Sequence, residues 1–301
     1  MKRELKILIG YDGSKYCDAA IDDLTRAGLP PKVKALVVSV GDAPTIPPLA
    51  SQEVTEKAVI GERAASIVAH ANEQAAEALR QAGKLALRAS KRLKSHFPSW
   101  QISSEVLAGT PAEELIAKAA HWKSDLLVVG SQGRSAIGRL ILGSVSLEVA
   151  RESNCSVRIG REPDYETKRK EIRILVGIDG PKGLDRTLRK LLGRDWPVGT
   201  ELRVVAVADG ESAILTNKLA GSSGAVVTNK IVELAVSKGL IVSAGILQGD
   251  PKRTLLAEAV EWGADCIVVG SSRSKTKPGF FESSVSLGLA ADAECTIEIV
   301  R

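Results

Sequence analysis

A glycine-rich stretch, VVGSQGRSAIGRLILGSVS at residues 128–146, holds the residue types best suited to bind an anion. Its glycines lie between an apolar run typical of a strand and a pattern typical of a helix. Because glycine has no Cβ and adopts positive φ easily, its backbone can approach a ligand closely. The helix expected near Ser144 offers peptide N–H groups and the positive end of its dipole. The stretch therefore predicts a phosphate site, with hydroxyl donors from Ser144 and Ser146.

The stretch differs from two common phosphate-binding loops. It has no Gly-Lys-Ser/Thr, so no lysine is aimed at terminal phosphates, and it is not the GxGxxG of dinucleotide enzymes. In an alternative interpretation, the glycines only join a strand to a helix. The residues at neighbouring strand ends help to decide between a phosphate site and a simple connection.

Asp12 directly follows the first apolar segment, in IGYDGS. Its carboxylate is expected to face a nucleotide, on a ribose or on a phosphate-bound Mg²⁺, because Mg²⁺ is often held by one carboxylate plus phosphates and waters. In the alternative interpretation, Asp-Gly-Ser starts and caps the next helix, and both roles can coexist at one strand end. Val40, at the end of the second strand, is predicted to contact a base, or else to be a core valine.

The elements that must position these residues alternate between strand and helix. Apolar runs rich in Val, Ile and Leu are typical of a parallel sheet covered on both faces. Strand–helix alternation predicts a doubly wound α/β sheet, in which ligands bind beyond the carboxyl ends of the strands where the strand order reverses. If the order reverses beside the first strand, Asp12, Val40 and the glycine-rich stretch meet at one crevice. The strands predicted in the first half are KILIG, ALVVSV, ISSEVL, DLLVVG and SVRIG.

The chain repeats itself, with four matched segments in the same order in each half. Examples are LKILIGYDGS at 5–14 with IRILVGIDGP at 172–181, and SVSLEVARESNCSVRIGR at 144–161 with SVSLGLAADAECTIEIVR at 284–301. We therefore expect a first domain at 1–162, a polar linker at 163–171 and a second domain at 172–301.

The offset between matched positions is 167 at Asp12 and Asp179 but 140 at Gly130 and Gly270, a difference of 27 residues. The extra residues of the first half fall within 43–100. This segment is rich in Ala, Leu, Lys, Glu and Arg, and it predicts one or two amphipathic helices packed on the sheet.

Composition narrows the class of protein. A length of 301 residues fits two domains, and a net charge of +5 without a polybasic surface argues against nucleic acid as the main partner. No apolar stretch of about 18 residues and no secretory signal are seen, so we expect a cytoplasmic protein with no membrane partner. The four cysteines stand singly, which favours reduced thiols over disulfides or a zinc site.

The quoted residues match a known pattern: the chain resembles the universal stress proteins in a tandem form, over nearly its whole length. The nucleotide signature of that family is Gly, two residues, Gly, nine residues, Gly, then Ser or Thr, which Gly130, Gly133, Gly143 and Ser144 fit. Asp12 and Val40 sit where its ATP-binding members place an aspartate and an adenine-contacting valine. The nucleotide contacts predicted on this basis are Gly10, Tyr11, Asp12, Val40, Val129, Gly130, Gln132, Gly133, Gly143, Ser144, Val145 and Ser146.

The resemblance implies two five-stranded, Rossmann-like domains that bind ATP, or ADP or AMP. Adenine is expected near Val40, ribose near Gly130 and phosphates along Gln132 to Ser146. In this family the last strands pair across a two-fold axis, so CSVRIGR and CTIEIVR are expected to pair within one chain as a pseudo-dimer, with a homodimer left open.

The second half departs from the signature. It keeps Gly270 but has Arg273 and Ser283 where the second and third glycines fall, and its other equivalents are Asp179, Val207 and Ser284. A side chain at the glycine positions projects toward the phosphates, so we expect the second pocket not to bind ATP as the first does. The alternative is that Arg273, Lys275 and Lys277 bind a different phosphorylated ligand.

Three classes of function follow from the sequence. The leading hypothesis is a nucleotide-dependent sensor or regulator in stress response, read by an unidentified protein partner. A slow ATPase or phosphotransferase is the alternative, although the glycine-rich stretch has no histidine, no second acid and no Walker lysine for acid–base chemistry. The third class is an interaction module whose pockets hold no nucleotide.

Overall fold

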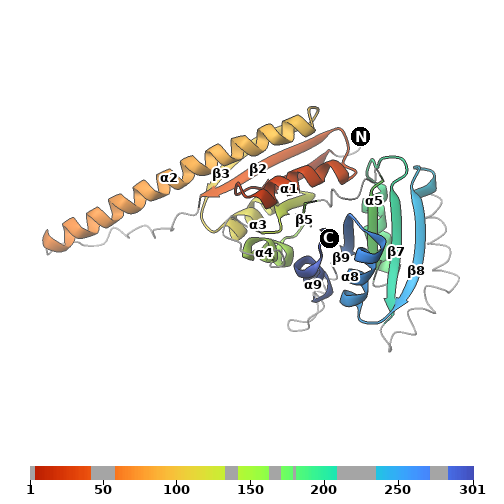
Figure 1. Ribbon diagram of the computed structural model, residues 1–301. Coiled ribbons are helices and arrows are strands. Elements are labelled where there is room, and N and C mark those ends of the chain that lie inside the picture. Colours follow the sequence, from red (N-terminus) through yellow and green to blue (C-terminus); the bar gives the residue numbers. More distant parts are fainter. Residues whose placement is uncertain are drawn as a thin grey trace.

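The structure is a computed structural model that describes residues 4–41, 58–132, 142–162, 171–178, 181–208, 235–271 and 284–301. Its strands form one ten-stranded sheet with the order β3-β2-β1-β4-β5-β10-β9-β6-β7-β8. Five of these strands come from each half of the chain, and helices flank the sheet in both halves (Figure 1).

The first half contains the five strands predicted from its apolar runs, each within two residues of the predicted bounds. These strands are β1 (Leu5–Gly10), β2 (Val33–Gly41), β3 (Gln101–Ala108), β4 (Leu126–Gly130) and β5 (Ser156–Gly160). The connecting helices are α1 (Lys15–Asp23) with the 3-10 turn η1 (Leu24–Arg26), α2 (Ala58–His96), α3 (Pro111–Trp122) and α4 (Ser144–Glu152). Neighbouring strands within this half are all parallel, as the continuous apolar runs predict.

Two apolar layers cover the faces of this sheet. Residues of α1 and α2 pack with Ile7, Ile9 and Val37 on one face. Residues of α3 and α4 pack with Leu8, Leu36 and other strand residues on the other face. Successive side chains of a strand point to opposite faces, so Ile7 and Leu8 belong to different layers. The strand order reverses between β1 and β4, which is the switch point expected from the sequence.

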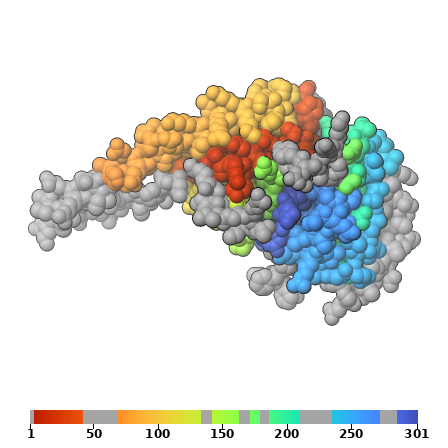
Figure 2. All heavy atoms as spheres, in the orientation of Figure 1, coloured from red at the N-terminus to blue at the C-terminus, as the bar shows by residue number. Residues whose placement is uncertain are grey.

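The extra residues of the first half include one long helix, α2, of 39 residues. At about 1.5 Å per residue it is roughly 58 Å long, which is far longer than the strands it crosses. Among residues 69–96, where the side chains of α2 are described, the buried positions are Ala82, Ala86, Ala89 and Leu93. The amino-terminal part extends beyond the sheet (Figure 1), and the coloured residues of the helix project from the body in the space-filling view (Figure 2).

The second half repeats the order of elements. Its described elements are β6 (Arg173–Ile178), α5 (Pro181–Leu192), β7 (Glu201–Ala208), β8 (Ile241–Gln248), α8 (Pro251–Trp262), β9 (Cys266–Gly270), α9 (Ser284–Asp292) and β10 (Thr296–Val300). Its strands are parallel to one another, and the order again reverses between β6 and β9.

The halves join through their last strands. β5 and β10 pair antiparallel, with Val157 opposite Ile299 and Ile159 opposite Ile297. One apolar cluster runs through this join and includes residues of α4 and α9. The expectation of two doubly wound α/β units joined as an intrachain pseudo-dimer is confirmed. Within the described ranges, no helix combines the length and apolar character needed to span a bilayer.

Candidate functional site

Three strand ends lie side by side at one edge of the first half. β1 runs between β2 and β4, so that Ile9 is opposite both Val37 and Val128. Just beyond β1, the Tyr11 amide donates to the Val38 carbonyl at 2.9 Å, and the Ser39 hydroxyl donates to the Tyr11 carbonyl at 2.7 Å. The sheet therefore places the residues after β1, at the end of β2 and after β4 along one edge.

Asp12 and Ser14 organise the start of α1. The Ser14 amide donates to Asp12 Oδ1 at 2.9 Å, and Ser14 Oγ accepts from the Cys17 amide at 3.2 Å. The helix-starting role proposed for Asp-Gly-Ser is thus observed, with Ser14 as the capping residue. The Ser14 hydroxyl also donates to the Gln132 carbonyl at 3.4 Å, which brings the segment after β4 against α1.

Gly130 has a packing role that does not depend on a ligand. A Cβ at this position would lie 2.7 Å from the Tyr16 carbonyl carbon and 2.8 Å from the Cys17 amide nitrogen. These are backbone atoms at the start of α1, so only glycine allows this approach. At the equivalent Gly270, a Cβ would lie 3.5 Å from Thr187 Oγ1, an ordinary contact.

The amino terminus of α4 is left open for an acceptor. Gly143 is its N-cap residue, with φ −64° and ψ 151°, and no side chain of the described residues caps the helix. The first intrahelical bond runs from the Leu147 amide to the Gly143 carbonyl at 2.9 Å. The amides of Ser144, Val145 and Ser146 therefore come before the first amide that donates within the helix, that of Leu147, and they lie at the positive end of the helix dipole. By contrast, Ser14 caps α1.

Gln132, just after β4, and Ser146, in the first turn of α4, are buried polar residues at the two described ends of the glycine-rich stretch. Ser146 Oγ donates to the Gly130 carbonyl at 2.6 Å, which links the two ends of the glycine-rich stretch. Gln132 is 4% exposed, and among the residues that the structure describes its buried Oε1 atom has no hydrogen-bond partner. An unpaired buried acceptor costs about 1–3 kcal/mol, so this atom suits a donor that a ligand brings.

The remaining predicted contacts are mainly backbone or apolar. The Tyr11 hydroxyl donates to Asp18 Oδ1 at 2.6 Å, and burial together with this bond raises the pKa of Tyr11. Its side chain thus packs among α1 and α2, leaving its backbone at the edge. Gly10, at the end of β1, leaves room for Leu115. The side chains of Val40, Val129 and Val145 belong to the layer formed with α3 and α4.

Several predicted residues lie outside the described ranges: Gly133 in the first half, and Asp179, Arg273, Lys275, Lys277 and Ser283 in the second. In the second half, Val207 lies in β7, Gly270 ends β9 and Ser284 begins α9.

The described residues include no group of three or more His, Cys, Asp or Glu side chains arranged to hold a metal ion. The cysteines Cys17, Cys155, Cys266 and Cys295 are free thiols.

A cleft of 340 Å³ lies elsewhere, at the join of the two halves. It is formed where β5 ends and β9 and β10 begin, beside the Arg26–Asp265 ion pair. None of the described nucleotide-contact residues lines it, so it is separate from the predicted site.

A family model of universal stress proteins matches residues 5–161 and again residues 172–301. The chain belongs to the universal stress protein family. A universal stress protein of Methanocaldococcus jannaschii is 35% identical over 92 residues, which are 30% of this chain and 52% of that protein. One of Mycobacterium tuberculosis H37Rv is 28% identical over 184 residues, or 60% of this chain and 56% of that protein. The chain spans about half the length of the curated relatives it matches.

Among solved structures, the universal stress protein of Archaeoglobus fulgidus superposes with a TM-score of 0.61 at 19% identity, covering 98% of each chain. A second one, from Pseudomonas aeruginosa, gives 0.55 at 14% identity, covering 99% of this chain and 93% of the other. At these identities the likeness establishes the fold of this universal stress protein, which is α/β over the whole chain.

Two features of the structure were not predicted from the sequence. Ser39 joins the ends of β1 and β2, and nothing in its neighbourhood in the sequence distinguishes it from other strand serines. Arg158 and Glu298 are charged residues inside apolar strands, and they face each other across the join. The opposite charges at equivalent positions of the two repeats were a signal that could have revealed this pair.

Proposed function

We propose that the first half binds an adenine nucleotide, in the first place ATP, and that occupancy regulates the interaction of the chain with a protein partner. Two observations carry this proposal: among the described residues no side chain caps the amino terminus of α4, and the buried amide oxygen of Gln132 has no hydrogen-bond partner. The Gly143 amide donates to the Ser131 carbonyl at 2.9 Å, so the start of α4 lies against the residue next to Gln132. Both lie at the switch point of the sheet, where doubly wound folds bind ligands.

The residues present fit such a ligand. The first-turn amides of α4 and the exposed Ser144 hydroxyl are suited to phosphate oxygens. The Gln132 amide oxygen accepts a hydrogen bond that a ribose hydroxyl or the adenine amino group supplies. Asp12 is the carboxylate for a ribose, or for Mg²⁺ carried in by the phosphates, and Val40 contacts the base.

We favour regulation over catalysis because the site offers few groups for proton transfer. The described polar groups there are Asp12, serines and an amide, and Asp12 and Ser14 already organise α1. A slow ATPase remains the alternative function. The test is to measure phosphate release by the full chain and by a variant that no longer binds ATP. Phosphate release that is present in the full chain and lost in the variant would favour the ATPase. The cytoplasmic location stays a prediction.

The substitution Gly143→Asp tests the proposal. Its backbone conformation suits an N-cap aspartate, whose carboxylate would bind the first-turn amides and repel phosphates. We expect the affinity for ATP, measured by calorimetry, to fall by about 10- to 100-fold, or roughly 1.4–2.7 kcal/mol. The melting temperature should be unchanged or higher.

Gly143→Asn is the matched control, because asparagine caps equally well without a charge. It should lose less affinity than Gly143→Asp. Equal ATP affinity in the wild-type chain and in Gly143→Asp would refute phosphate binding at α4.

The second half is proposed not to bind ATP in the same way, because Arg273 and Ser283 replace signature glycines. The full chain should then bind one ATP, and Gly143→Asp should remove that single binding event. Two equivalent binding events in calorimetry, one of them surviving in Gly143→Asp, would assign an ATP site to the second half.

A further inference from the structure

Equivalent positions of the two repeats carry opposite charges where the halves join. The matched segments 144–161 and 284–301 make Arg158 equivalent to Glu298. The antiparallel register places these two residues directly opposite each other. The pseudo-two-fold axis of the join therefore passes between an arginine and a glutamate, whereas the flanking positions are apolar in both strands.

This pair is buried and fully engaged. Arg158 and Glu298 are each 1% exposed, and Arg158 Nη1 donates to Glu298 Oε2 at 2.9 Å. Asp23 of the first half pairs with Arg158 Nε at 2.6 Å, while Arg194 of the second half pairs with Glu298 through Nη1 at 3.0 Å and through Nη2. Two carboxylates and two guanidiniums thus balance one another.

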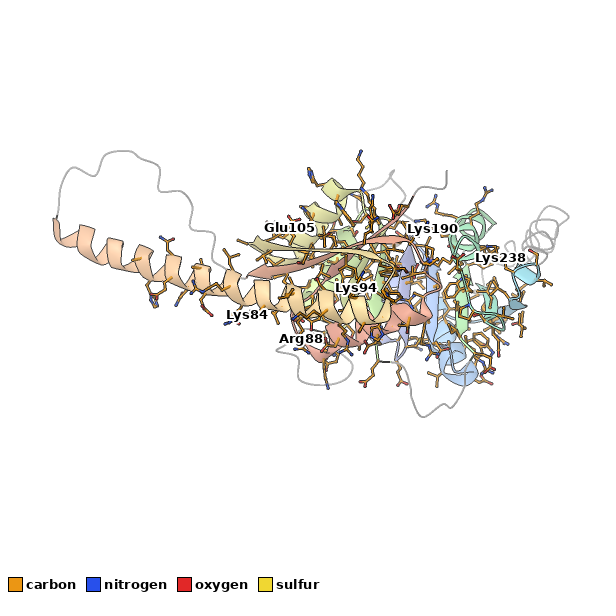
Figure 3. The ribbon with its side chains drawn as sticks, turned by 90° about the horizontal axis from the view of Figure 1, so that it is seen from above. Lys84, Arg88, Lys94, Glu105, Lys190 and Lys238 are labelled. Carbon is orange, nitrogen blue, oxygen red and sulfur yellow. The ribbon has the colours of Figure 1, made fainter. Side chains whose placement is uncertain are left out.

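The helices beside the join show the same inversion of charge. With the offset of 167, Asp23 of α1 is equivalent to Lys190 of α5. Asp23 Oδ1 accepts from Thr296 Oγ1 at 2.9 Å, and Lys190 Nζ donates to Ser156 Oγ at 2.9 Å. Thr296 and Ser156 are themselves equivalent. In each half, the charged helix residue therefore bonds the hydroxyl at the start of the other half's last strand, but the charge is negative at Asp23 and positive at Lys190. Figure 3 labels Lys190 in the region where the halves meet.

Other contacts across the join are the same in both directions. The Arg161 guanidinium donates to the carbonyls of Cys295 and Ala290, at 3.1 and 2.6 Å. The equivalent Arg301 donates to the carbonyls of Cys155, at 3.3 Å, and of Ala150. The join is therefore symmetric in its backbone and in these arginines, but inverted in the charges at its centre.

We propose that the charge-inverted cluster, formed by Asp23, Arg158, Lys190, Arg194 and Glu298, makes each half select the unlike half and reject a second copy of itself. Self-pairing in the same register would place Arg158 opposite Arg158, or Glu298 opposite Glu298, in a buried strand pair. Like charges directly opposite each other in antiparallel strands are destabilising. Each Arg158 would keep its own Asp23, but the cross-strand bond to Glu298 would have no counterpart.

The experiment uses two full-length variants, Arg158→Glu and Glu298→Arg. Each variant places like charges opposite each other within its own chain. Together they are complementary, because Arg158 of one chain can pair with Glu298 of the other, and the two new residues can pair as well. We expect each variant alone to melt at a lower temperature than the wild type. Co-expressed with different tags, the two should co-purify as a 1:1 dimer of twice the 31.8 kDa chain mass.

Lys118→Glu provides a matched control, since it reverses a charge whose partner, Glu105, lies in the same half, 2.5 Å away. This variant should not co-purify with a wild-type chain. If Arg158→Glu and Glu298→Arg melt like the wild type and never co-purify, the proposal is wrong. Should either variant be insoluble on its own, rescue of its solubility by co-expression supports the proposal.

A double-mutant cycle on full-length chains decides the case in which both variants misfold. In Arg158→Gln, Glu298→Gln and the double variant, the loss of melting temperature in the double variant should be smaller than the sum of the two single losses. Additive losses would show that the two halves are not coupled through these charges, and would overturn the proposal.

Discussion

At the scale of single residues, most polar groups of the candidate site are satisfied within the chain. Asp12 and Ser14 hold the start of α1, and Ser146 holds the Gly130 carbonyl. Gln132 differs, because its amide oxygen is buried without a partner. An unpaired buried acceptor destabilises the fold, and we expect such an acceptor to be kept where it binds a ligand. A substitution of Gln132 should therefore lower ligand affinity without lowering the stability of the fold.

Gln132→Leu replaces the amide with an apolar group of similar size. We expect the free energy of unfolding without nucleotide to rise by about 1 kcal/mol, because an unpaired buried acceptor is removed. The affinity for ATP should fall by about tenfold, which is the loss of one hydrogen bond of roughly 1.4 kcal/mol. Urea denaturation and calorimetry measure the two changes. A variant that is less stable and binds ATP normally would assign Gln132 a purely structural role.

Residue types and spacing were enough to bring the candidate site together, but not to assign every role. The sequence placed Asp12, Val40 and Gly130 at one edge, since parallel strands that flank a switch point must end there. It could not show that Gly130 makes room for the first turn of α1, because that approach depends on how the helix crosses β4. Likewise, the direction of the Tyr11 side chain depends on Asp18, a residue on the next element.

At the scale of elements, α2 shows how composition predicts a helix but not its extent. The abundance of Ala, Leu, Lys, Glu and Arg within 43–100 predicted one or two helices, and the described part of this segment, 58–100, contains one. Small residues at Ala82, Ala86 and Ala89 let the helix lie close to the sheet. Ion pairs from Arg88 to Asp18 and from Arg92 to Asp22 hold it against α1; Figure 3 labels Arg88 on this helix.

Leucines on α2 offer a matched pair of substitutions. Leu93 is fully buried, whereas Leu87 is 54% exposed on the same helix. We expect Leu93→Ala to lower the free energy of unfolding by about 2–5 kcal/mol, through lost apolar burial and the cavity left behind. Leu87→Ala should change it by no more than about 0.5 kcal/mol. Similar losses in denaturant titrations of the two variants would contradict the packing of α2 on the sheet.

At the scale of the whole molecule, stability should depend on pH through the join. Burial by itself raises the pKa of Glu298, but Arg194 and Arg158 outweigh it and hold the pKa below its ordinary value of 4.5. A lowered pKa means that the ionised group stabilises the fold above pH 4.5, and that this contribution is lost as the pH falls through the folded-state pKa.

Glu298→Gln should therefore be less stable than the wild type at pH 7, by about 3–5 kcal/mol for breaking a buried ion pair. The difference between the two melting temperatures should narrow as the pH falls below about 4.5. Glu201→Gln, which breaks a partly exposed pair with Arg173, is the control and should show a small difference at every pH. A gap for Glu298→Gln that stayed constant down to pH 3 would contradict ionisation of Glu298 in the folded chain.

The resemblance to the universal stress proteins implied that the last strands of the two repeats pair, and the structure confirms this pairing through β5 and β10. The repeat pattern supplied the two equivalent strands, one at the end of each half. The opposite charges of Arg158 and Glu298, which face each other where β5 and β10 pair, were not predicted. The balance of charge there depends on Asp23 and Arg194, which are far from their partners in the sequence and approach them only through the path of α1 and α5.

The antiparallel join also reverses the sense of the sheet at its middle. Strands of the first half end on one rim, and those of the second half end on the opposite rim. The carboxyl ends of β4 at Gly130 and of β9 at Gly270 therefore lie on opposite rims of the sheet. A protein that binds over the rim at Gly130 meets the starting ends of β9 and β10, and it cannot contact both rims without wrapping around the sheet.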